Sequence, residues 1–225
     1  MTIRRDLNIL EERNLVQLVH GAAIYNKGAV STTGDKKYEL HDEKDKRARE
    51  KLAIGEKAVS LIEPHDVIII DAGTTTEYMA RLLPEDIPLT VICFTANVLV
   101  EIYKKPSVKI YFAGGYYHRN TQMFESPEGL EMIKRICATK SFISAAGVCQ
   151  KLGVTCVNQY EVKTKRACID SSLDNVLLLD STKFNQIRPS YFAKLTEFNT
   201  IITDSGIKPQ WKEYINELGI TLYVV

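Results

Sequence analysis

Residues Asp71 to Thr76 combine residue types that favour the binding of an anion. They read DAGTTT and follow directly on a run of β-branched residues, Val67 to Ile70. Such a run is typical of a strand buried on both faces, and residues 77–83 continue with apolar side chains at helical spacing. N–H groups at the start of that helix point outward, its dipole favours negative charge, and threonine hydroxyls add donors. We therefore predict a strand, a tight glycine turn and a helix start suited to phosphate.

Two other interpretations bear on this segment. Thr74 or Thr75 could simply cap the helix, which is a common role for a hydroxyl residue at such a position. Two well-known phosphate loops are excluded, because no Gly-Lys-Ser/Thr follows as in a Walker A loop, and the later glycines of a dinucleotide fingerprint are absent. From the segment alone, the helix cap and the phosphate site both stay open.

Strands and helices are expected to alternate along most of the chain. Besides residues 67–70, β-branched and aromatic runs predict strands at 90–94, 108–112, 141–145, 176–180, 200–203 and 220–224. Apolar residues at helical spacing predict helices at 42–62, 76–83, 96–103, 126–138, 159–172 and 209–218. Residues 153–157 are expected to form a loop or an edge strand. The alternation predicts an α/β fold, with a mostly parallel sheet that helices cover on both faces.

Polar or glycine-bearing turns follow five of the predicted strands. They are Asp71–Thr76, Thr95–Asn97, Gly114–Gly115, Ala146–Gly147 and Asp180–Lys183. The carboxyl ends of parallel strands lie at the same end of a sheet, and ligands of such folds bind there. Several such turns together predict a binding cleft.

The composition is that of a globular protein with one substantial α/β domain, alone or with a small appendage. Of 225 residues, 45% are hydrophobic and 25% are charged, and the formal net charge is +1. This net charge provides no overall attraction to nucleic acid or membrane. The five cysteines show no CxxC spacing, which favours reduced thiols in a cytoplasmic protein over a disulfide frame or a zinc site. No apolar run approaches the roughly 20 residues that span a bilayer, and no signal peptide is recognisable.

The N-terminal residues contain a candidate DNA-binding element. Apolar residues at helical spacing share one face of an expected helix, while Arg4 and Arg5 lie on another. Residues 15–19 then alternate like one arm of a β-hairpin, so helix and hairpin match the back half of a winged helix-turn-helix. A surface helix with solvated arginines is the alternative. About 20 residues cannot bury a helix-turn-helix core alone, so we expect the sequence to be truncated at its N-terminus.

The whole set of motifs resembles the DeoR family of bacterial sugar-responsive transcriptional repressors, over nearly the full chain. The segment TIRRDLNILEERNLVQLVHGAA resembles the family's recognition helix and wing. The landmarks of the effector domain are matched in order and spacing by IDAGTTT, AGG at 113–115, Glu161 with Lys165 and Arg166, and DSTKF at 180–184. The joint match favours the DNA-binding interpretation of Arg4 and Arg5.

The resemblance implies a domain organisation and a function. Residues 1–24 would be a partial winged helix-turn-helix, residues 25–41 a linker arm, and residues 42–225 a sensor domain similar to ribose-5-phosphate isomerase and coenzyme A transferases. The sensor would bind a phosphorylated sugar and use no cofactor or metal. Family members are typically homo-oligomers that bind operator DNA through paired winged helices.

The matched motifs and the strand-end turns together name the candidate binding residues. Gly73 to Thr76 would hold the phosphate, while Asp71, Glu161, Lys165 and Lys183 would face the sugar. The full effector set is Asp71, Gly73, Thr74, Thr75, Thr76, Thr95, Asn97, Gly114, Gly115, Gly147, Glu161, Lys165 and Lys183. The DNA-binding set is Thr2, Arg4, Arg5 and His20.

Some positions depart from the family pattern. Cys93 and Phe94 stand where Thr-Asn is common, and Phe94 is expected to remove a polar group close to the cleft. Ser126 and Ser144 stand where glycine is common, and Asn185 replaces another glycine. We expect the Phe94 change to affect the identity of the effector more than the fold.

A regulator is expected rather than an enzyme, because the DNA-binding element already supplies a role for ligand binding. The linker arm and the helix at 42–62 would couple effector binding to DNA binding. The alternative is a sugar-phosphate isomerase, with Glu161 or Asp71 as the base and Lys165 or Lys183 as the cation beside the oxyanion. The spacing of Glu161 and Lys165 also fits an ordinary ion pair on a helix surface.

Overall fold

The structure, a computed structural model, describes residues 16–19, 22–25, 39–44 and 46–225. The chain divides into two compact units, Met1–Lys37 and Tyr38–Val225. In the first unit, β1 (Val16–Val19) pairs with β2 (Ala22–Tyr25) in an antiparallel hairpin, which confirms the expected hairpin arm. The expected recognition helix lies outside the described residues. None of the described helices combines the length and the apolar character needed to cross a membrane.

A sheet of seven parallel strands forms the centre of the second unit, in the order β14-β13-β11-β8-β3-β4-β5. The strands are β3 (Val67–Ile70), β4 (Leu89–Cys93), β5 (Val108–Phe112), β8 (Ala138–Ser144), β11 (Ser172–Leu178), β13 (Thr200–Thr203) and β14 (Thr221–Val224). Each coincides with a strand expected from the sequence, although β8 and β11 begin earlier. The predicted parallel α/β fold is confirmed.

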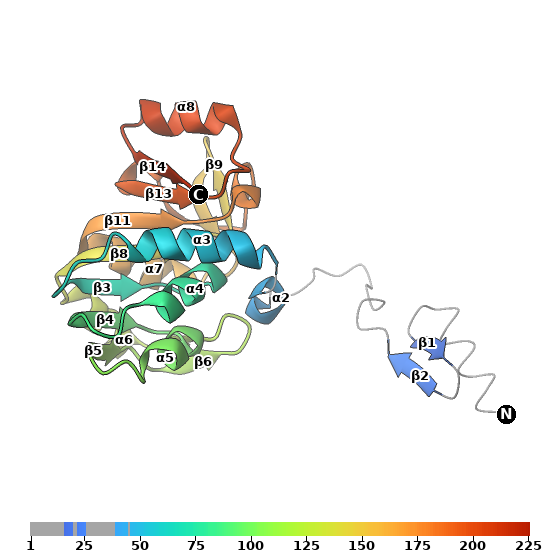
Figure 1. Cartoon of the computed structure of the whole chain (residues 1–225), viewed down its shortest axis with the longest axis horizontal. Helices are drawn as coiled ribbons and strands as arrows, with labels where there is room; N and C mark the ends of the chain where they lie inside the picture. The colour runs from blue at the N-terminus through green and yellow to red at the C-terminus, as the bar shows by residue number, and fades with distance from the viewer. Residues whose placement is uncertain (1–15, 20–21, 26–38, 45) are drawn as a thin grey trace. The chain divides into compact units, whose positions relative to one another are not determined.

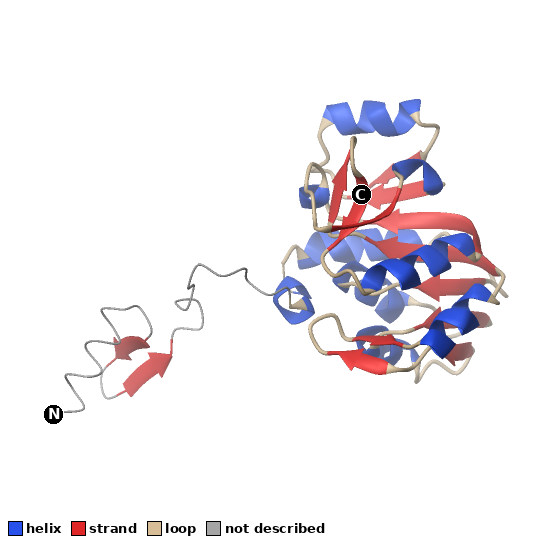
Figure 2. Cartoon of the chain, turned by 180° about the vertical axis from the view of Figure 1, so that it is seen from behind, coloured by secondary structure: helices blue, strands red, loops and turns tan. Residues whose placement is uncertain are grey.

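Helices cover both faces of this sheet (Figures 1 and 2). On the face toward the viewer in Figure 1 lie α3 (Ala48–Val59), α4 (Thr74–Leu82) and α5 (Ala96–Ile102). The opposite face carries α6 (Pro127–Lys134), α7 (Glu161–Asp170) and α8 (Pro209–Glu217). A hydrophobic core lies on each face of the sheet, and strand β3 contributes to both. Ile68 and Ile70 pack with the first set of helices, and Ile69 packs with the second. This two-sided burial explains the unbroken β-branched run.

Two small antiparallel sheets were not expected from the sequence. One pairs β6 (Tyr116–His118) with β7 (Met123–Glu125), and the other has the order β12-β10-β9. The strands of the latter are β9 (Gly147–Cys149), β10 (Gly153–Cys156) and β12 (Ser190–Ala193). Because β10 has a partner on each side, the expectation of a loop or an edge strand at 153–157 was wrong. Two short 3-10 helices, η1 (Ser181–Lys183) and η2 (Leu195–Glu197), follow β11 and β12.

The expectation of a single helix at 42–62 was also wrong, because two helices, α2 (Leu40–Lys44) and α3, occupy this part of the chain. Between them Arg47 has a left-handed backbone, with φ 56°. Its guanidinium Nη2 lies 3.0 Å from Asp204 Oδ2 and 3.0 Å from Glu50 Oε1. The chain therefore changes direction at the residue that makes the tertiary contact with Asp204.

Candidate functional site

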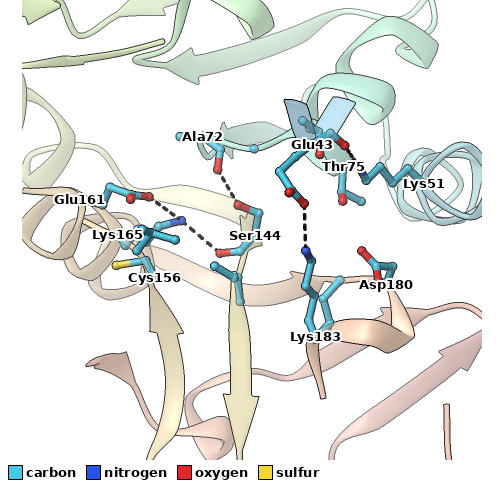
Figure 3. A pocket seen from close by; sticks show the side chains of 16 residues that line it. Glu43, Lys51, Ala72, Thr75, Ser144, Cys156, Glu161, Lys165, Asp180 and Lys183 are labelled. Carbon is cyan, nitrogen blue, oxygen red and sulfur yellow. Dashed lines mark hydrogen bonds and ion pairs between the residues drawn. The ribbon is translucent and has the colours of Figure 1, made fainter. Parts of the chain in front are cut away.

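A small cavity lies at the carboxyl end of the central sheet, where the turns after β3, β8 and β11 meet. Its volume is about 50 Å³, which is room for a few water molecules. Figure 3 shows side chains from α2, α3, α7 and η1 pointing into it. The charged residues that line it are Lys51, Lys165, Lys183, Glu43, Glu161 and Asp180. The convergence of strand-end turns that the sequence predicts is therefore present.

The start of α4 forms one wall of the cavity. Gly73 is the N-cap residue and makes no side-chain cap, so the interpretation of Thr74 or Thr75 as a simple helix cap is wrong. Thr74 and Thr75 line the cavity, whereas the Thr76 hydroxyl turns inward and donates to Asp71 O at 2.8 Å. The first N–H groups of a helix have no partner within the helix. This wall therefore presents backbone donors, two hydroxyl side chains and the positive end of a helix dipole.

A buried ion pair forms the floor behind that wall. Lys165 Nζ lies 2.5 Å from Asp71 Oδ2 and donates to Ser144 O at 3.0 Å, and both side chains of the pair are almost fully buried. Burial alone would lower the pKa of Lys165, but the charges of Asp71 and Glu161 outweigh it and raise that pKa. Lys165 therefore stays protonated and supplies a fixed positive charge to the cavity.

Glu161 sits at the first turn of α7 on the same side. Its Oε1 accepts from Asn158 N at 3.1 Å and from Asn158 Nδ2 at 2.8 Å, and its Oε2 lies 4.0 Å from Lys165 Nζ. Burial raises the pKa of Glu161 above its usual range, although the charge of Lys165 opposes the rise. The neighbouring Cys156 thiol also lines the cavity, and burial raises its pKa to about 12. It is therefore not a reactive thiolate at neutral pH.

The opposite side of the cavity carries two further lysines and a carboxylate from α2. Lys183 Nζ lies 3.4 Å from Glu43 Oε2, and Lys51 Nζ donates to the main-chain oxygen of Glu43. Burial lowers the pKa of Lys51, a shift that Asp180 and Glu43 partly offset. Burial would raise the pKa of Glu43, but Lys46 and Lys183 lower it overall. The cavity thus lies between cations that come from α3, α7 and η1.

The structure brings together only part of the predicted effector set. The members that line the cavity are Gly73, Thr74, Thr75, Glu161, Lys165 and Lys183. Asp71, Thr76 and Asn97 lie behind it and hold its parts in place, since Asn97 Nδ2 donates to Gly73 O at 3.1 Å. Their direct contact with an effector stays a prediction.

The other predicted members are not among the residues that line the cavity. Thr95, the residue just before α5, is fully buried and forms an isolated β-bridge with Met123. Gly114 accepts a hydrogen bond from Ser126 Oγ at 2.8 Å, and Gly115, with φ 142°, packs against Glu125 in the neighbouring hairpin. Gly147 begins β9, where a side chain would meet Gln186 O at 2.5 Å. Gly115 and Gly147 serve close backbone packing, which their position after a strand did not distinguish from ligand binding, whereas a side chain at Gly114 would meet no neighbouring atom.

The departures from the family pattern also have places in the structure. Phe94 is buried in the core and is not among the cavity-lining residues. The expectation that it changes the cleft directly is therefore not supported. Ser144 does line the cavity, and its hydroxyl donates to Ala72 O at 2.5 Å.

Sequence reasoning missed Glu43 and Lys51 as cavity residues. Both lie in a stretch of mixed lysine, arginine and glutamate, where nothing in the sequence separates these two from their solvent-facing neighbours. The proposed DNA-binding residues Thr2, Arg4, Arg5 and His20 lie outside the described residues.

A parallel α/β domain with a cavity lined by three lysines and three acids at its strand ends, joined to an N-terminal unit with a hairpin, has the organisation of a ligand-responsive regulator. A family model described as the DeoR C terminal sensor domain matches residues 46–205. A second model, the DeoR-like helix-turn-helix domain, matches residues 1–29. The chain belongs to the DeoR family of transcriptional regulators, as the resemblance indicated.

Curated relatives match over almost the whole chain. The deoxyribose operon repressor of Escherichia coli (strain K12) is 29% identical over 222 residues, which are 99% of this chain and 85% of the repressor. The L-fucose operon activator of Haemophilus influenzae is 32% identical over 222 residues, which are 97% of this chain and 86% of the activator. One relative is named a repressor and the other an activator.

Solved structures with a related arrangement share little sequence with this chain. A probable sor operon regulator from Shigella flexneri has a TM-score of 0.47 at 9% identity, covering 75% of this chain and 89% of that one. Ribose 5-phosphate isomerase A from Methanocaldococcus jannaschii has a TM-score of 0.45 at 14% identity, covering 60% and 53%.

Proposed function

We propose that this DeoR-family regulator controls genes of sugar metabolism as a repressor, and that its sensor domain binds a phosphorylated sugar in the cavity at the strand ends. The observation that carries the proposal is the meeting of the α4 helix start with Lys51, Lys165 and Lys183 around one small space. Helix N-termini and lysines are the groups that recognise phosphate in proteins.

The two sides of the cavity suit the two parts of such a ligand. Gly73, Thr74 and Thr75 would donate to the phosphate, with Lys183 and Lys51 as charge partners. Glu161 would accept from sugar hydroxyls, because its Oε2 makes only a long contact of 4.0 Å with Lys165. Asp71 acts indirectly in this proposal, by holding Lys165 in place.

The N-terminal unit supplies the output. The match of residues 1–29 to a helix-turn-helix model supports DNA binding by this region. We propose Thr2, Arg4, Arg5 and His20 as DNA contacts, residues 25–41 as the linker arm, and a homo-oligomer as the operator-binding form. Arginine contacts to phosphates and base edges would give the binding a steep salt dependence.

The isomerase alternative is less well supported by the contacts in the cavity. Lys165 is already held by Asp71 at 2.5 Å, and Glu161 Oε1 is held by Asn158. The groups that an isomerase would use as cation and base are thus engaged with each other and with their neighbours. Interconversion of pentose or hexose phosphates on mixing with the protein, followed by NMR, would contradict a purely sensory role.

A thermal-shift screen tests the proposal. Sugar phosphates are compared with the same sugars without phosphate, and a ligand at 100 times its dissociation constant is expected to add about 2.7 kcal/mol of stability. Only the phosphorylated members of each pair should stabilise the protein. Stabilisation by the free sugars to the same extent would contradict phosphate recognition.

The affinity of the stabilising sugar phosphate is then measured by calorimetry for the unmodified chain and for the Thr75→Val variant. Loss of one hydrogen bond to a charged group costs about 1.5–3 kcal/mol, so affinity should fall about tenfold or more. Thr221→Val is the matched control, because Thr221 is an exposed residue of β14 that does not line the cavity. Equal affinities for the two variants would rule out the α4 start as the phosphate site.

A further inference from the structure

Helix α2 covers the cavity with its own anion. In Figure 3 the Glu43 carboxylate points from α2 toward Lys183, and the two are joined at 3.4 Å between Oε2 and Nζ. Lys51, from α3, donates to the main-chain oxygen of the same residue. One residue of α2 therefore engages both of the lysines on this side of the cavity.

We propose that α2 is an internal competitor of the effector: Glu43 holds Lys183 and Lys51 in the unliganded protein, and a phosphate group that takes over these lysines releases α2. The inference rests on the function proposed above and concerns the regulation of the same site. It assigns to Glu43 a role in deciding which ligands can enter.

The size of the cavity supports this assignment. Its volume of about 50 Å³ is far below the roughly 300–1,000 Å³ of typical ligand pockets. Glu43 is the member of α2 that lines it. A sugar phosphate therefore fits only if the chain around the opening moves, and α2, a helix of five residues, is one of the elements around it.

Helix α2 is held mainly by contacts that can exchange. A helix of five residues is not stable by itself, so its place depends on tertiary interactions. Lys44 Nζ lies 2.5 Å from Glu77 Oε1, and Leu40 N donates to Asn120 O at 2.8 Å. In this pair the Lys44 side chain is 37% exposed and that of Glu77 is 4% exposed, so water reaches the lysine side of the contact. Leu40 is the buried residue among those members of α2 whose burial the structure describes.

A phosphate group competes well with the Glu43 carboxylate. It carries up to two negative charges and three acceptor oxygens, so it can accept from both lysines and from the α4 helix start at once. A neutral sugar has no charge to offer to Lys183 or Lys51, and would leave both lysines with Glu43. The competition therefore selects phosphorylated ligands over free sugars.

The position of α2 in the chain gives its release a consequence. The sensor unit begins at Tyr38, so α2 is its first helix after the N-terminal unit. Just after α2, Arg47 has its left-handed backbone and is tied to Asp204 at 3.0 Å. This anchor keeps α3 on the sheet while α2 moves. Ligand binding thus changes the chain at the point where it leaves the sensor.

The first test compares Glu43→Gln with the unmodified 225-residue chain, using inorganic phosphate as the probe in calorimetric titrations. Removing the competing charge should tighten phosphate binding about threefold or more, the equivalent of a partly exposed ion pair. Asp42→Asn is the matched control, because Asp42 is an exposed acid in the same helix, and its affinity should stay within about 1.5-fold of the parent, since exposed charges interact weakly. Equal affinity of Glu43→Gln and the parent would overturn the proposal.

The second test follows hydrogen exchange of the peptide at residues 39–44 in the unmodified protein, with phosphate or chloride at equal ionic strength. Exchange should be faster with phosphate, and Glu43→Gln should show faster exchange already in chloride. Slower exchange with phosphate would mean that α2 closes over the ligand, which overturns the proposal. Phosphate or sugar-phosphate binding with unchanged exchange overturns this inference alone, whereas no binding of either ligand overturns the proposed function as well.

Discussion

Strand β3 is flanked by an aspartate at each end, and the two carboxylates differ in how completely their oxygens are paired. At the amino end, both carboxylate oxygens of Asp66 are paired: Oδ1 accepts from Thr139 Oγ1 at 2.7 Å, and Oδ2 accepts from Glu63 N at 2.8 Å and Lys140 Nζ at 2.7 Å. At the carboxyl end, Asp71 Oδ2 is paired with Lys165. Within the described part of the chain, Asp71 Oδ1 is buried without a hydrogen-bond partner.

The difference separates a stabilising end of the sheet from the end at which we propose that the effector binds, called the binding end below. Around Asp66 the carboxylate, hydroxyl and ammonium groups satisfy each other. Around Asp71 the structure buries a charge pair beneath a cavity, and unpaired buried polar groups are costly. A protein tolerates that cost where the groups serve a ligand. The four predictions below test this contrast, from the largest effect to the smallest.

Lys165→Met should have the largest effect on stability. It leaves the Asp71 carboxylate buried without its cation, and breaking a buried pair in this way costs about 3–5 kcal/mol. Urea unfolding measures the change. The double variant Asp71→Asn/Lys165→Met removes both charges and should recover much of the loss. If the double variant is as unstable as the single one, charge burial is not the reason for the loss.

Gly73→Ala should damage the binding end through close packing. A Cβ at residue 73 would lie 2.5 Å from Ser144 Oγ, so the turn before α4 must shift. The expected cost is about 1–3 kcal/mol, together with loss of phosphate binding. Ser144→Gly in the same chain removes the obstructing hydroxymethyl group and should restore binding in part. No recovery in the double variant would show that the turn is disturbed for another reason.

Asp66→Asn should destabilise the protein by about 1–2 kcal/mol, because it weakens charged hydrogen bonds at the amino end. Effector binding at the other end of β3 should not change. Unfolding and calorimetry on the same preparation separate the two effects. A loss of affinity would contradict the division of the sheet into a stabilising end and a binding end.

The smallest expected effects are in the pH dependence of stability, with opposite signs for Asp66 and Glu161. Burial by itself would raise the pKa of Asp66, but the Glu63 N–H and Lys140 outweigh burial and lower that pKa. Its contribution is therefore complete above about pH 4 and is lost as the pH falls through the lower native pKa.

Burial raises the pKa of Glu161, so the folded protein loses stability as the pH rises from the unfolded value of about 4.3 through the native pKa. The free energy of unfolding, measured with urea between pH 3 and pH 7, should depend less on pH in each variant than in the unmodified chain. For Asp66→Asn the difference should appear at the acid end, and for Glu161→Gln above about pH 4.5. The same slopes in both variants would show that neither carboxyl titrates as its contacts indicate.

The central sheet could be predicted from the sequence because its signals are local. Runs such as Val67 to Ile70 mark buried strands wherever they occur in the chain. The β12-β10-β9 sheet could not be predicted in this way. Its strands have three or four residues each, and β12 comes from residues 190–193, far from β9 and β10 in sequence. Its formation depends on long-range pairing rather than on local preference.

The residues of the candidate site also fall into two groups, those that local sequence signals predict and those whose position depends on the tertiary structure. Gly73, Thr74 and Thr75 were predictable because glycine, hydroxyls and a helix start adjoin in sequence. Lys165 and Lys183 were placed by their family motifs. Glu43 and Lys51 were not, because their place at the cavity follows from the break between α2 and α3 at Arg47.

The amino-acid sequence by itself determined the alternation of strands and helices, the end of the sheet where the cavity lies, the helix start suited to phosphate, and membership of the DeoR family. Each of these depends on residues that are neighbours in sequence or that recur with a regular period. Only the tertiary structure decided which charges meet. It paired Lys165 with Asp71, left Asp71 Oδ1 without a partner in the described chain, and set Glu43 against Lys183. Charges interact through space, and that spatial arrangement exists only after the sheet and its helices have assembled.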